Sequence, residues 1–106
     1  MLKGLTDIKE RTLHLTQKTF NTNQLHIWDI YHFGGYAKKT DELIEFINNS
    51  WRQYQLPLDF VYTGKAFYAL IDNIKKDYFM KGSNILFIHT GGLQGNLSLP
   101  EHTLLF

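Results

Sequence analysis

Residues 58–92 read LDFVYTGKAFYALIDNIKKDYFMKGSNILFIHTGG and contain the two clearest structural patterns of the chain. Apolar side chains in the middle of this stretch follow the spacing of one helix face: Phe67, Leu70, Ile71, Ile74 and Tyr78. The spacing predicts an amphipathic helix that opens at Thr63–Gly64 and extends to Tyr78. The unbroken run Asn84–His89 is typical of a buried parallel strand. A helix followed by such a strand indicates an α/β layer structure.

A second helix is predicted upstream, beginning at about Thr40. The Thr40 hydroxyl can cap the first turn, and Asp41 and Glu42 follow it where the helix dipole favours negative charge. One apolar stripe runs along this segment: Leu43, Ile44, Phe46, Ile47, Trp51 and Tyr54. Pro57 then forces the chain out of the helix. These features predict an amphipathic helix that buries one face.

Several shorter segments complete the pattern. Residues 25–31 alternate in the manner of a strand and are followed by a Gly-Gly break, and residues 60–62 form a short apolar step. Residues 5–15 are compatible with a short helix, and residues 21–23 form a polar turn. Residues 103–106 are either an edge strand or a disordered end. Two or three strands cannot cover a buried parallel strand, so the pattern is that of part of a larger structure.

Composition excludes several classes of protein. The chain has 106 residues, of which 43% are hydrophobic, and this predicts a single domain over residues 1–106. A net charge of +1 without long basic runs gives no footprint for nucleic acid. No apolar run approaches the roughly 20 residues of a membrane span. With 0 cysteines and no signal-peptide pattern, we expect a cytoplasmic protein.

The first candidate for chemistry is the segment around the opening of the second helix. Tyr62, Thr63 and Lys65 place a phenol, a hydroxyl and an ammonium group near a helix N-terminus, where free backbone N–H groups attract anions. In the alternative interpretation, Thr63 caps the helix, Gly64 permits a close approach and Tyr62 packs against the core. Spacing alone favours the cap.

The second candidate is His89–Gly92, at the carboxyl end of the predicted strand. Ligands of open α/β sheets bind at this end of the strands. The alternative interpretation is a simple Gly-Gly turn, which is again favoured. A phosphate-binding loop is rejected because residues 93–100 have no helical stripe to follow it.

Other polar residues give weaker signals. The 5 histidines lack the spacing of a zinc site, so we predict no metal. Asp41, Glu42 and Glu45 belong to the solvated face of the first helix. Tyr36, which follows the Gly34–Gly35 break, is either a loop aromatic that folds onto the core or a functional phenol, and composition leaves both open.

Two motifs carry a resemblance to a known family. The segments DFVYTGK and FMKGSNILFIHTGG resemble the family motifs D-P-V-Y-[ET]-G-K and F-P-x-G-S-x-[VI]-L-F-x-H with its following T-G-G loop, in the same order. Residues 31–92 are thereby similar to the C-terminal part of pyridoxal-phosphate enzymes that include 1-aminocyclopropane-1-carboxylate deaminase and D-cysteine desulfhydrase. The resemblance implies the tryptophan synthase beta-like fold, a three-layer αβα structure, with this chain in its large cofactor-binding domain.

The resemblance also implies roles for individual residues. Tyr36 and Tyr62 match the two active-site tyrosines, Thr63 and Thr90 match positions that face the pyridine nitrogen, and Gly91 lies in the cofactor loop. The group opposite this nitrogen tunes how strongly the cofactor accepts electrons. A carboxylate would hold the nitrogen protonated, whereas a hydroxyl would not. The family's deaminases tend to have Glu and Leu at the two threonine positions, so Thr63 and Thr90 favour the desulfhydrase branch.

The family's Schiff-base lysine and phosphate-binding loop lie N-terminal to the matched part. Neither has a counterpart in this sequence, and Lys65 belongs to the helix-opening motif instead. We therefore expect a C-terminal fragment, inactive by itself, of a homodimeric enzyme that binds pyridoxal phosphate and a small amino-acid substrate. The alternative is a cofactor-free α/β interaction module that associates through sheet edges left uncovered.

Overall fold

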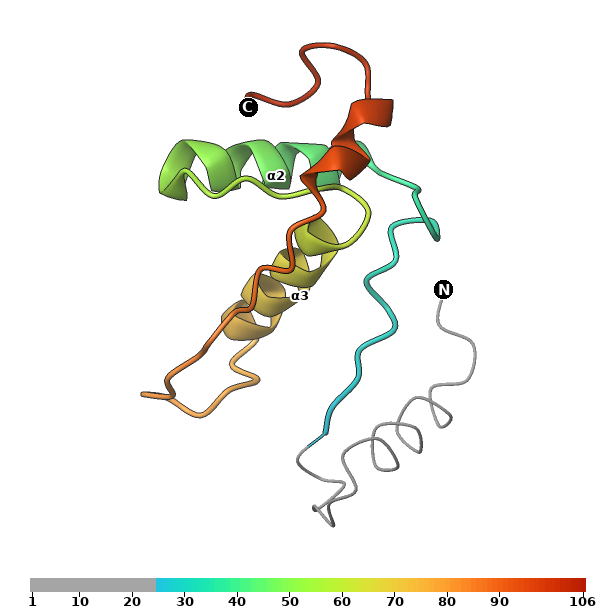
Figure 1. The fold of residues 1–106 in the computed structure, drawn as a ribbon. Coiled ribbons are helices and arrows are strands. Elements are labelled where there is room, and N and C mark those ends of the chain that lie inside the picture. Colours follow the sequence, from blue (N-terminus) through green and yellow to red (C-terminus); the bar gives the residue numbers. More distant parts are fainter. Residues whose placement is uncertain (1–24) are drawn as a thin grey trace. The chain divides into compact units, whose positions relative to one another are not determined.

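The computed structural model describes residues 25–106, so the predicted short helix at residues 5–15 and the turn at residues 21–23 lie outside the described part. Residues 25–30 belong to one unit of the chain, and Tyr31–Phe106 form the other. The second unit contains three helices, α2 (Asp41–Tyr54), α3 (Thr63–Lys75) and the 3₁₀ helix η2 (Leu93–Ser98), joined by long irregular segments (Figure 1). Within residues 25–106, no helix is long and apolar enough to cross a membrane.

Helix α2 forms as its sequence predicts. The Thr40 hydroxyl accepts a hydrogen bond from the Leu43 N–H at 3.2 Å, and the helix ends where Gln55 turns into the left-handed region at φ 51°. Leu43 and Ile47, one turn apart, are fully buried. The predicted start of this helix is confirmed, and so is the buried face at Leu43 and Ile47, but Tyr54, predicted as the last residue of the apolar stripe, is 62% exposed.

Removal of the α2 cap gives a first testable prediction. Thr40→Ala leaves one N–H of the first turn without its side-chain partner, so we expect a loss of about 1 kcal/mol of unfolding free energy. Urea titration followed by circular dichroism measures this loss. Lys39→Ala, on the preceding exposed residue, is the matched control and should be neutral. Equal effects of the two substitutions would contradict the capping role.

Helix α3 opens at Thr63 as predicted but ends earlier than its apolar stripe suggests. Asp77 adopts φ 58°, and the N–H groups of Asp77 and Tyr78 donate to the carbonyls of Ile74 and Asn73 at 3.1 and 3.0 Å. This pattern satisfies the last free carbonyls of the helix and reverses the chain. Tyr78, predicted as the last residue of the stripe, therefore lies beyond the end of α3.

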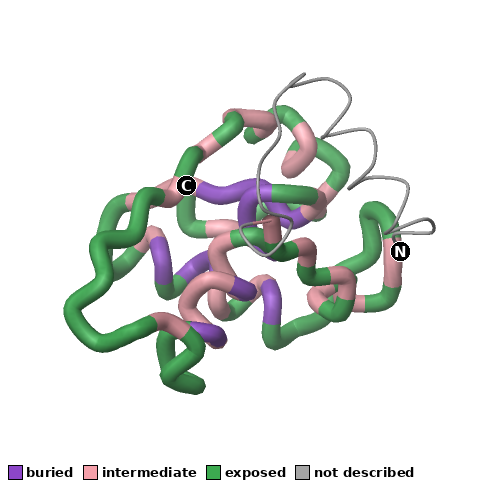
Figure 2. The backbone as a smooth tube through the Cα atoms, turned by 90° about the horizontal axis from the view of Figure 1, so that it is seen from below, coloured by how far each residue is buried: buried purple, intermediate pink, exposed green. Residues whose placement is uncertain are grey.

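The core lies where α2, α3 and the segment between them meet. Its fully or almost fully buried apolar residues are Leu43, Ile47, Leu58 and Phe60 (Figure 2). Partly buried aromatic rings extend the core along α3, since Phe67 packs against Phe46 and Phe87 with ring centroids 5.8 and 5.1 Å apart. The core therefore holds the start of α3 in a fixed position beside α2.

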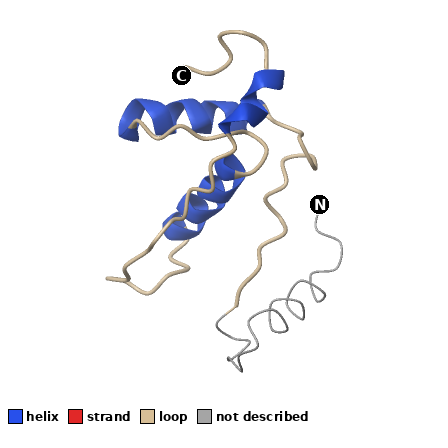
Figure 3. Cartoon of the chain, viewed as in Figure 1, coloured by secondary structure: helices blue, strands red, loops and turns tan. Residues whose placement is uncertain are grey.

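The predicted strands do not form within residues 25–106 (Figure 3). Residues 60–62 make a turn that leads into α3, and residues 84–90 lack regular secondary structure. Leu86 and Ile88 are 85% and 72% exposed, although a buried strand was expected there. A strand needs a neighbouring strand to pair its N–H and C=O groups, and the described residues supply none for this segment. The three-layer αβα arrangement is therefore not formed by the described residues.

The C-terminal residues are neither an edge strand nor a disordered end. The Asn48 side-chain amide donates to the Thr103 carbonyl at 3.1 Å, and the Leu105 N–H donates to the Asn48 Oδ1 atom at 3.0 Å. The rings of Trp51 and Phe106 lie 5.3 Å apart. These contacts dock the tail on α2.

Candidate functional site

Asp59 organises the start of α3. This residue is fully buried, and its carboxylate accepts hydrogen bonds from the backbone N–H groups of Val61, Tyr62 and Thr63 at 2.8, 2.7 and 3.0 Å. N–H groups at a helix start have no partner within the helix, so this carboxylate supplies one. The interpretation that Thr63 caps the helix is wrong, because Asp59 performs that role.

Thr63 is bound to the same carboxyl group. Its hydroxyl donates to the Asp59 Oδ1 atom at 2.5 Å and accepts from the Asp59 N–H at 2.9 Å, and the residue is only 2% exposed. Burial by itself raises the pKa of Asp59, but the hydrogen bonds from Thr63, Tyr62 and Val61 more than offset it, so the pKa lies below 3.8. A ligand can receive the Thr63 hydroxyl hydrogen only if the bond to Asp59 breaks.

Tyr36 and Tyr62 lie together on the surface. Their ring centroids are 6.1 Å apart with the ring planes tilted by 60°, and the residues are 71% and 61% exposed. A hydrogen bond with Tyr36 raises the pKa of Tyr62 above its usual value of 10.0. The expectation that Tyr62 packs into the core is wrong. Both phenols are accessible to a ligand.

The turn that carries Tyr36 is attached to α3 by a lysine. Gly34 and Gly35 adopt φ values of 99° and 119°, which only glycine takes up readily. The Lys65 ammonium group donates to the carbonyls of His32 and Gly35 at 2.7 and 2.9 Å. Burial lowers the pKa of Lys65. This contact could not be predicted from the sequence, because the two carbonyls that accept from Lys65 lie 33 and 30 residues away along the chain.

The segment before this turn runs along α3. The Tyr31 hydroxyl donates to the Asp72 carboxylate at 2.7 Å and accepts from the Asn73 amide at 3.0 Å. The rings of Phe33 and Tyr68 meet edge to face at 4.8 Å. These contacts, from the residue before the His32–Gly35 turn and from a residue within it, also hold the turn against the helix.

The loop that follows residue 88 is attached to the segment before α3. The His89 ring lies 2.7 Å from the Pro57 carbonyl through its Nε2 atom. The Asn96 side chain accepts from the Phe60 N–H at 3.0 Å and donates to the Leu58 carbonyl at 3.1 Å. His89 therefore binds the chain just before Asp59, and Asn96 binds the residues on either side of Asp59.

This loop approaches the Asp59 cap at Gly92. A Cβ atom placed on Gly92 would lie 3.6 Å from the Asp59 Oδ1 atom, so Gly92 passes close to the carboxylate, whereas a Cβ atom placed on Gly91 would meet no atom within 4 Å. Gly91 adopts φ 83°, and its N–H donates to the His89 ring at 3.0 Å. The Thr90 side chain is exposed. The structure therefore places the start of α3 against the Tyr36 turn, and it places Gly92 near the Asp59 carboxylate.

The tight packing of Gly64 gives a second prediction. A Cβ atom at this position would lie 2.5 Å from the Asp59 carbonyl oxygen and 2.8 Å from the Ile47 Cδ1 atom. Gly→Ala within a helix usually stabilises it by about 0.5–1 kcal/mol, but here we expect a loss of about 1–3 kcal/mol. Gly95→Ala is the control, because its Cβ would lie 3.5 Å from the nearest atom. Chemical denaturation of both variants tests this, and a stabilised Gly64→Ala variant would show that the close approach is absent.

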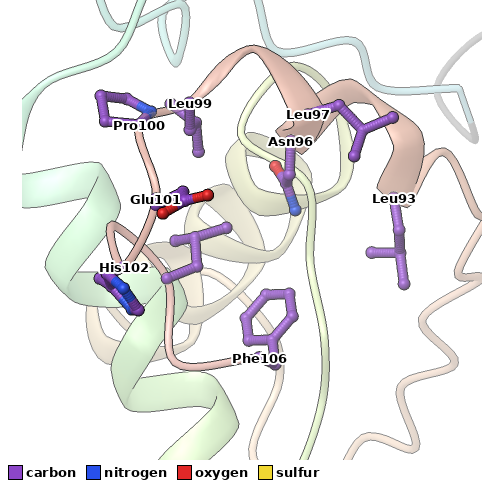
Figure 4. Close-up of a pocket in the computed structure, with 9 residues that line it drawn as sticks. Leu93, Asn96, Leu97, Leu99, Pro100, Glu101, His102 and Phe106 are labelled. Atoms are coloured by element: carbon purple, nitrogen blue, oxygen red, sulfur yellow. The ribbon is translucent and has the colours of Figure 1, made fainter.

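A hollow of about 470 Å³ lies beside the C-terminal residues (Figure 4). It is lined by residues of η2 and the tail: Leu93, Asn96, Leu97, Leu99, Pro100, Glu101, His102, Leu104 and Phe106. None of the predicted site residues is among them. This hollow is therefore distinct from the candidate site at the start of α3.

Among the proteins of known sequence that are similar to this chain, three from Pyrococcus species are each named "putative 1-aminocyclopropane-1-carboxylate deaminase". The Pyrococcus abyssi protein is 41% identical over 103 residues, which is 91% of this chain and 30% of that protein. The Pyrococcus furiosus protein is 43% identical over 78% of this chain, and the Pyrococcus horikoshii protein is 48% identical over 70%. The resemblance to the 1-aminocyclopropane-1-carboxylate deaminase family is confirmed.

The match covers only one part of these deaminase relatives. The chain spans 30% of the Pyrococcus abyssi protein, 24% of the Pyrococcus furiosus protein and 22% of the Pyrococcus horikoshii protein. No family model matches the chain, and no solved structure matches it significantly. The similarity to the deaminases therefore rests on sequence, and the activity of a whole protein is a matter for proposal.

Proposed function

We propose that this chain is the C-terminal part of a pyridoxal-phosphate-dependent enzyme with the tryptophan synthase beta-like fold. The enzyme releases ammonia from 1-aminocyclopropane-1-carboxylate or from D-cysteine. The names of the three Pyrococcus relatives support the first substrate. The observation that carries the proposal is the exposed pair of phenols, Tyr36 and Tyr62, beside the start of α3.

The accessible side chains fit the proposed ligands. When bound, the cofactor supplies an electron sink for the substrate carbanion. Tyr36 and Tyr62 bind and orient the substrate, and the phenol of Tyr62, like that of any ordinary tyrosine, is protonated at neutral pH, so that it can donate a hydrogen bond. By the family resemblance, Thr90 would lie near the ring nitrogen, and Gly91 would let the backbone approach the ring. For Thr63, a role at the nitrogen requires that ligand binding breaks its bond to Asp59.

The two substrates are supported by different observations. The relatives' names favour the cyclopropane amino acid. The hydroxyls of Thr63 and Thr90, in place of the Glu and Leu that the family's deaminases tend to carry, favour D-cysteine. Both substrates therefore belong in any assay of the proposal.

An exchange of segments tests the proposed function. The matching region of the Pyrococcus abyssi relative is replaced by this chain, and ammonia release is measured with each substrate and pyridoxal phosphate. We expect the exchanged protein to release ammonia from at least one of them. The unaltered relative is the reference for each assay. A folded exchanged protein that binds pyridoxal phosphate but releases no ammonia from either substrate would refute the proposal.

A second candidate function is that of a cofactor-free interaction module. It is favoured by the segment 84–90, whose Leu86 and Ile88 are exposed in a stretch without a strand partner. Such a segment can pair edge to edge with a second copy of the chain. Sedimentation of the chain and of a Leu86→Lys/Ile88→Lys variant distinguishes the two functions. Association that the lysines abolish, together with an inactive exchanged protein, would favour the module.

A further inference from the structure

Lys65 is a buried lysine whose bonds go to backbone carbonyls. The residue is 8% exposed, and its ammonium group donates to the His32 and Gly35 carbonyls at 2.7 and 2.9 Å. Within residues 25–106, no carboxylate forms an ion pair with it. Lysine side chains usually extend their charged ends into water, and a buried charge is costly unless it is well hydrogen-bonded. The two carbonyls therefore compensate for keeping this charge out of water.

The two accepting carbonyls lie at the two ends of one turn. The His32 carbonyl also accepts the Gly35 N–H at 3.1 Å, which closes the turn, and the Gly35 carbonyl also accepts the Lys38 N–H at 3.1 Å. Tyr36 is the residue after Gly35. Because the Lys65 ammonium group binds both ends of this turn, it also fixes the position at which the backbone continues into Tyr36.

Tyr62 immediately precedes α3, and Lys65 lies in its first turn. The Asp59 carboxylate fixes the N–H groups of Tyr62 and Thr63, and Lys65 extends from the helix two residues later to the Tyr36 turn. Both partners of the phenol pair are thus fixed relative to one helix end. Beside the contacts of Tyr31 and Phe33 with α3, the lysine is the link that joins the Tyr36 turn to the start of the helix.

We propose that Lys65 is a positioning residue that holds the His32–Gly35 turn on α3 and thereby keeps the Tyr36 ring against the Tyr62 ring. Its importance for turnover rests on the proposed function, but the ring contact itself does not. The position of Tyr36 and the titration of Tyr62 both depend on this link, because Tyr36 is the main cause of the raised pKa of Tyr62.

The test compares three variants of the whole chain by nuclear magnetic resonance without cofactor or substrate. Lys65→Met removes the donors and keeps the aliphatic length, Lys65→Arg keeps donors for the same carbonyls, and Lys39→Met is the control on an exposed residue. We expect Lys65→Met to lose the Overhauser contacts between the Tyr36 and Tyr62 rings and to return the pKa of Tyr62 towards 10.0. Lys65→Arg and Lys39→Met should keep both.

Three results would overturn the proposal. A folded Lys65→Met variant that keeps the ring contacts and the raised pKa of Tyr62 would show that Lys65 does not position Tyr36. Loss of the contacts in both Lys65→Met and Lys65→Arg would show that side-chain fit, and not donation to the carbonyls, holds the turn. If Lys65→Met does not fold, the test is instead the rate at which the Lys65 ammonium protons of the unaltered chain exchange with water. Exchange much slower than that of Lys39 supports the proposal, and equally fast exchange refutes it.

Discussion

Replacement of Asp59 by alanine is expected to lower the unfolding free energy of the chain by about 3–5 kcal/mol. The substitution removes the acceptor of three backbone N–H groups and of the Thr63 hydroxyl. A buried polar group without a partner costs about 1–3 kcal/mol. Water can reach the partly exposed Val61 and the exposed Tyr62, so the total is less than four full penalties. This loss is a large part of the about 5–15 kcal/mol typical of a domain.

Urea unfolding followed by circular dichroism measures the loss. Asp41→Ala is the matched control, because Asp41 is an exposed carboxylate in the first turn of α2 whose interaction with the helix dipole contributes at most about 1 kcal/mol. We expect the α3 signal to unfold at much lower urea in the Asp59 variant than in the control. Similar midpoints for the two variants would show that the carboxylate does not organise the start of α3.

The same carboxylate makes stability depend on pH in a defined direction. The pKa of Asp59 in the folded chain lies below 3.8, its value in the unfolded chain, so the folded state binds its proton less readily. The stabilisation is fully present above the unfolded pKa and is lost as the pH falls through the folded pKa. Asp59→Asn should remove this component, so the difference in stability between the two proteins should shrink below about pH 4.

Replacement of Tyr62 by phenylalanine is expected to lower the ammonia-releasing kcat of the exchanged Pyrococcus abyssi protein by about 100-fold. The phenol is exposed, and it carries its proton at neutral pH because the pKa of a tyrosine lies far above 7. Phenylalanine keeps the ring and its contact with Tyr36 but removes the hydroxyl of this side chain, which can hold or donate a proton. Because Tyr62 makes little core contact, the substitution should leave stability almost unchanged.

Tyr54→Phe is the matched control, since Tyr54 is also an exposed tyrosine but lies at the end of α2. Steady-state rates of ammonia release for both variants provide the comparison. If Tyr62→Phe keeps the same kcat as Tyr54→Phe, Tyr62 has no part in the reaction. If both variants lose activity together with their fold, circular dichroism reveals it.

The helices could be predicted from the sequence because their determinants are local. The Thr40 hydroxyl accepts a hydrogen bond from the N–H of Leu43, only three residues later. The apolar stripe of α2 likewise repeats within a short stretch of sequence. The strand at residues 84–89 could not be predicted correctly from its apolar run, because a strand exists only with a partner. In the described residues, this run has Phe87 against Phe67 and exposes Leu86 and Ile88.

The candidate site shows the same division between local and distant contacts. Its phenols were identified through the resemblance to the deaminase family, and the structure brings Tyr36 and Tyr62 together. The residues that hold the site were missed, because Lys65 and Asn96 bind backbone carbonyls 33 and 38 residues away. Asp59 could have been found, since an aspartate shortly before a helix commonly binds the following backbone N–H groups.

The central claim is that the start of α3 and the loop after residue 89 meet at one ligand. A crystal structure of the exchanged Pyrococcus abyssi protein with pyridoxal phosphate measures this most directly. We predict that Tyr62 and Thr90 each lie within about 4 Å of the bound cofactor or substrate. A cofactor ring in contact with neither residue, or with Tyr62 and Thr90 on opposite sides of the protein, would contradict the claim.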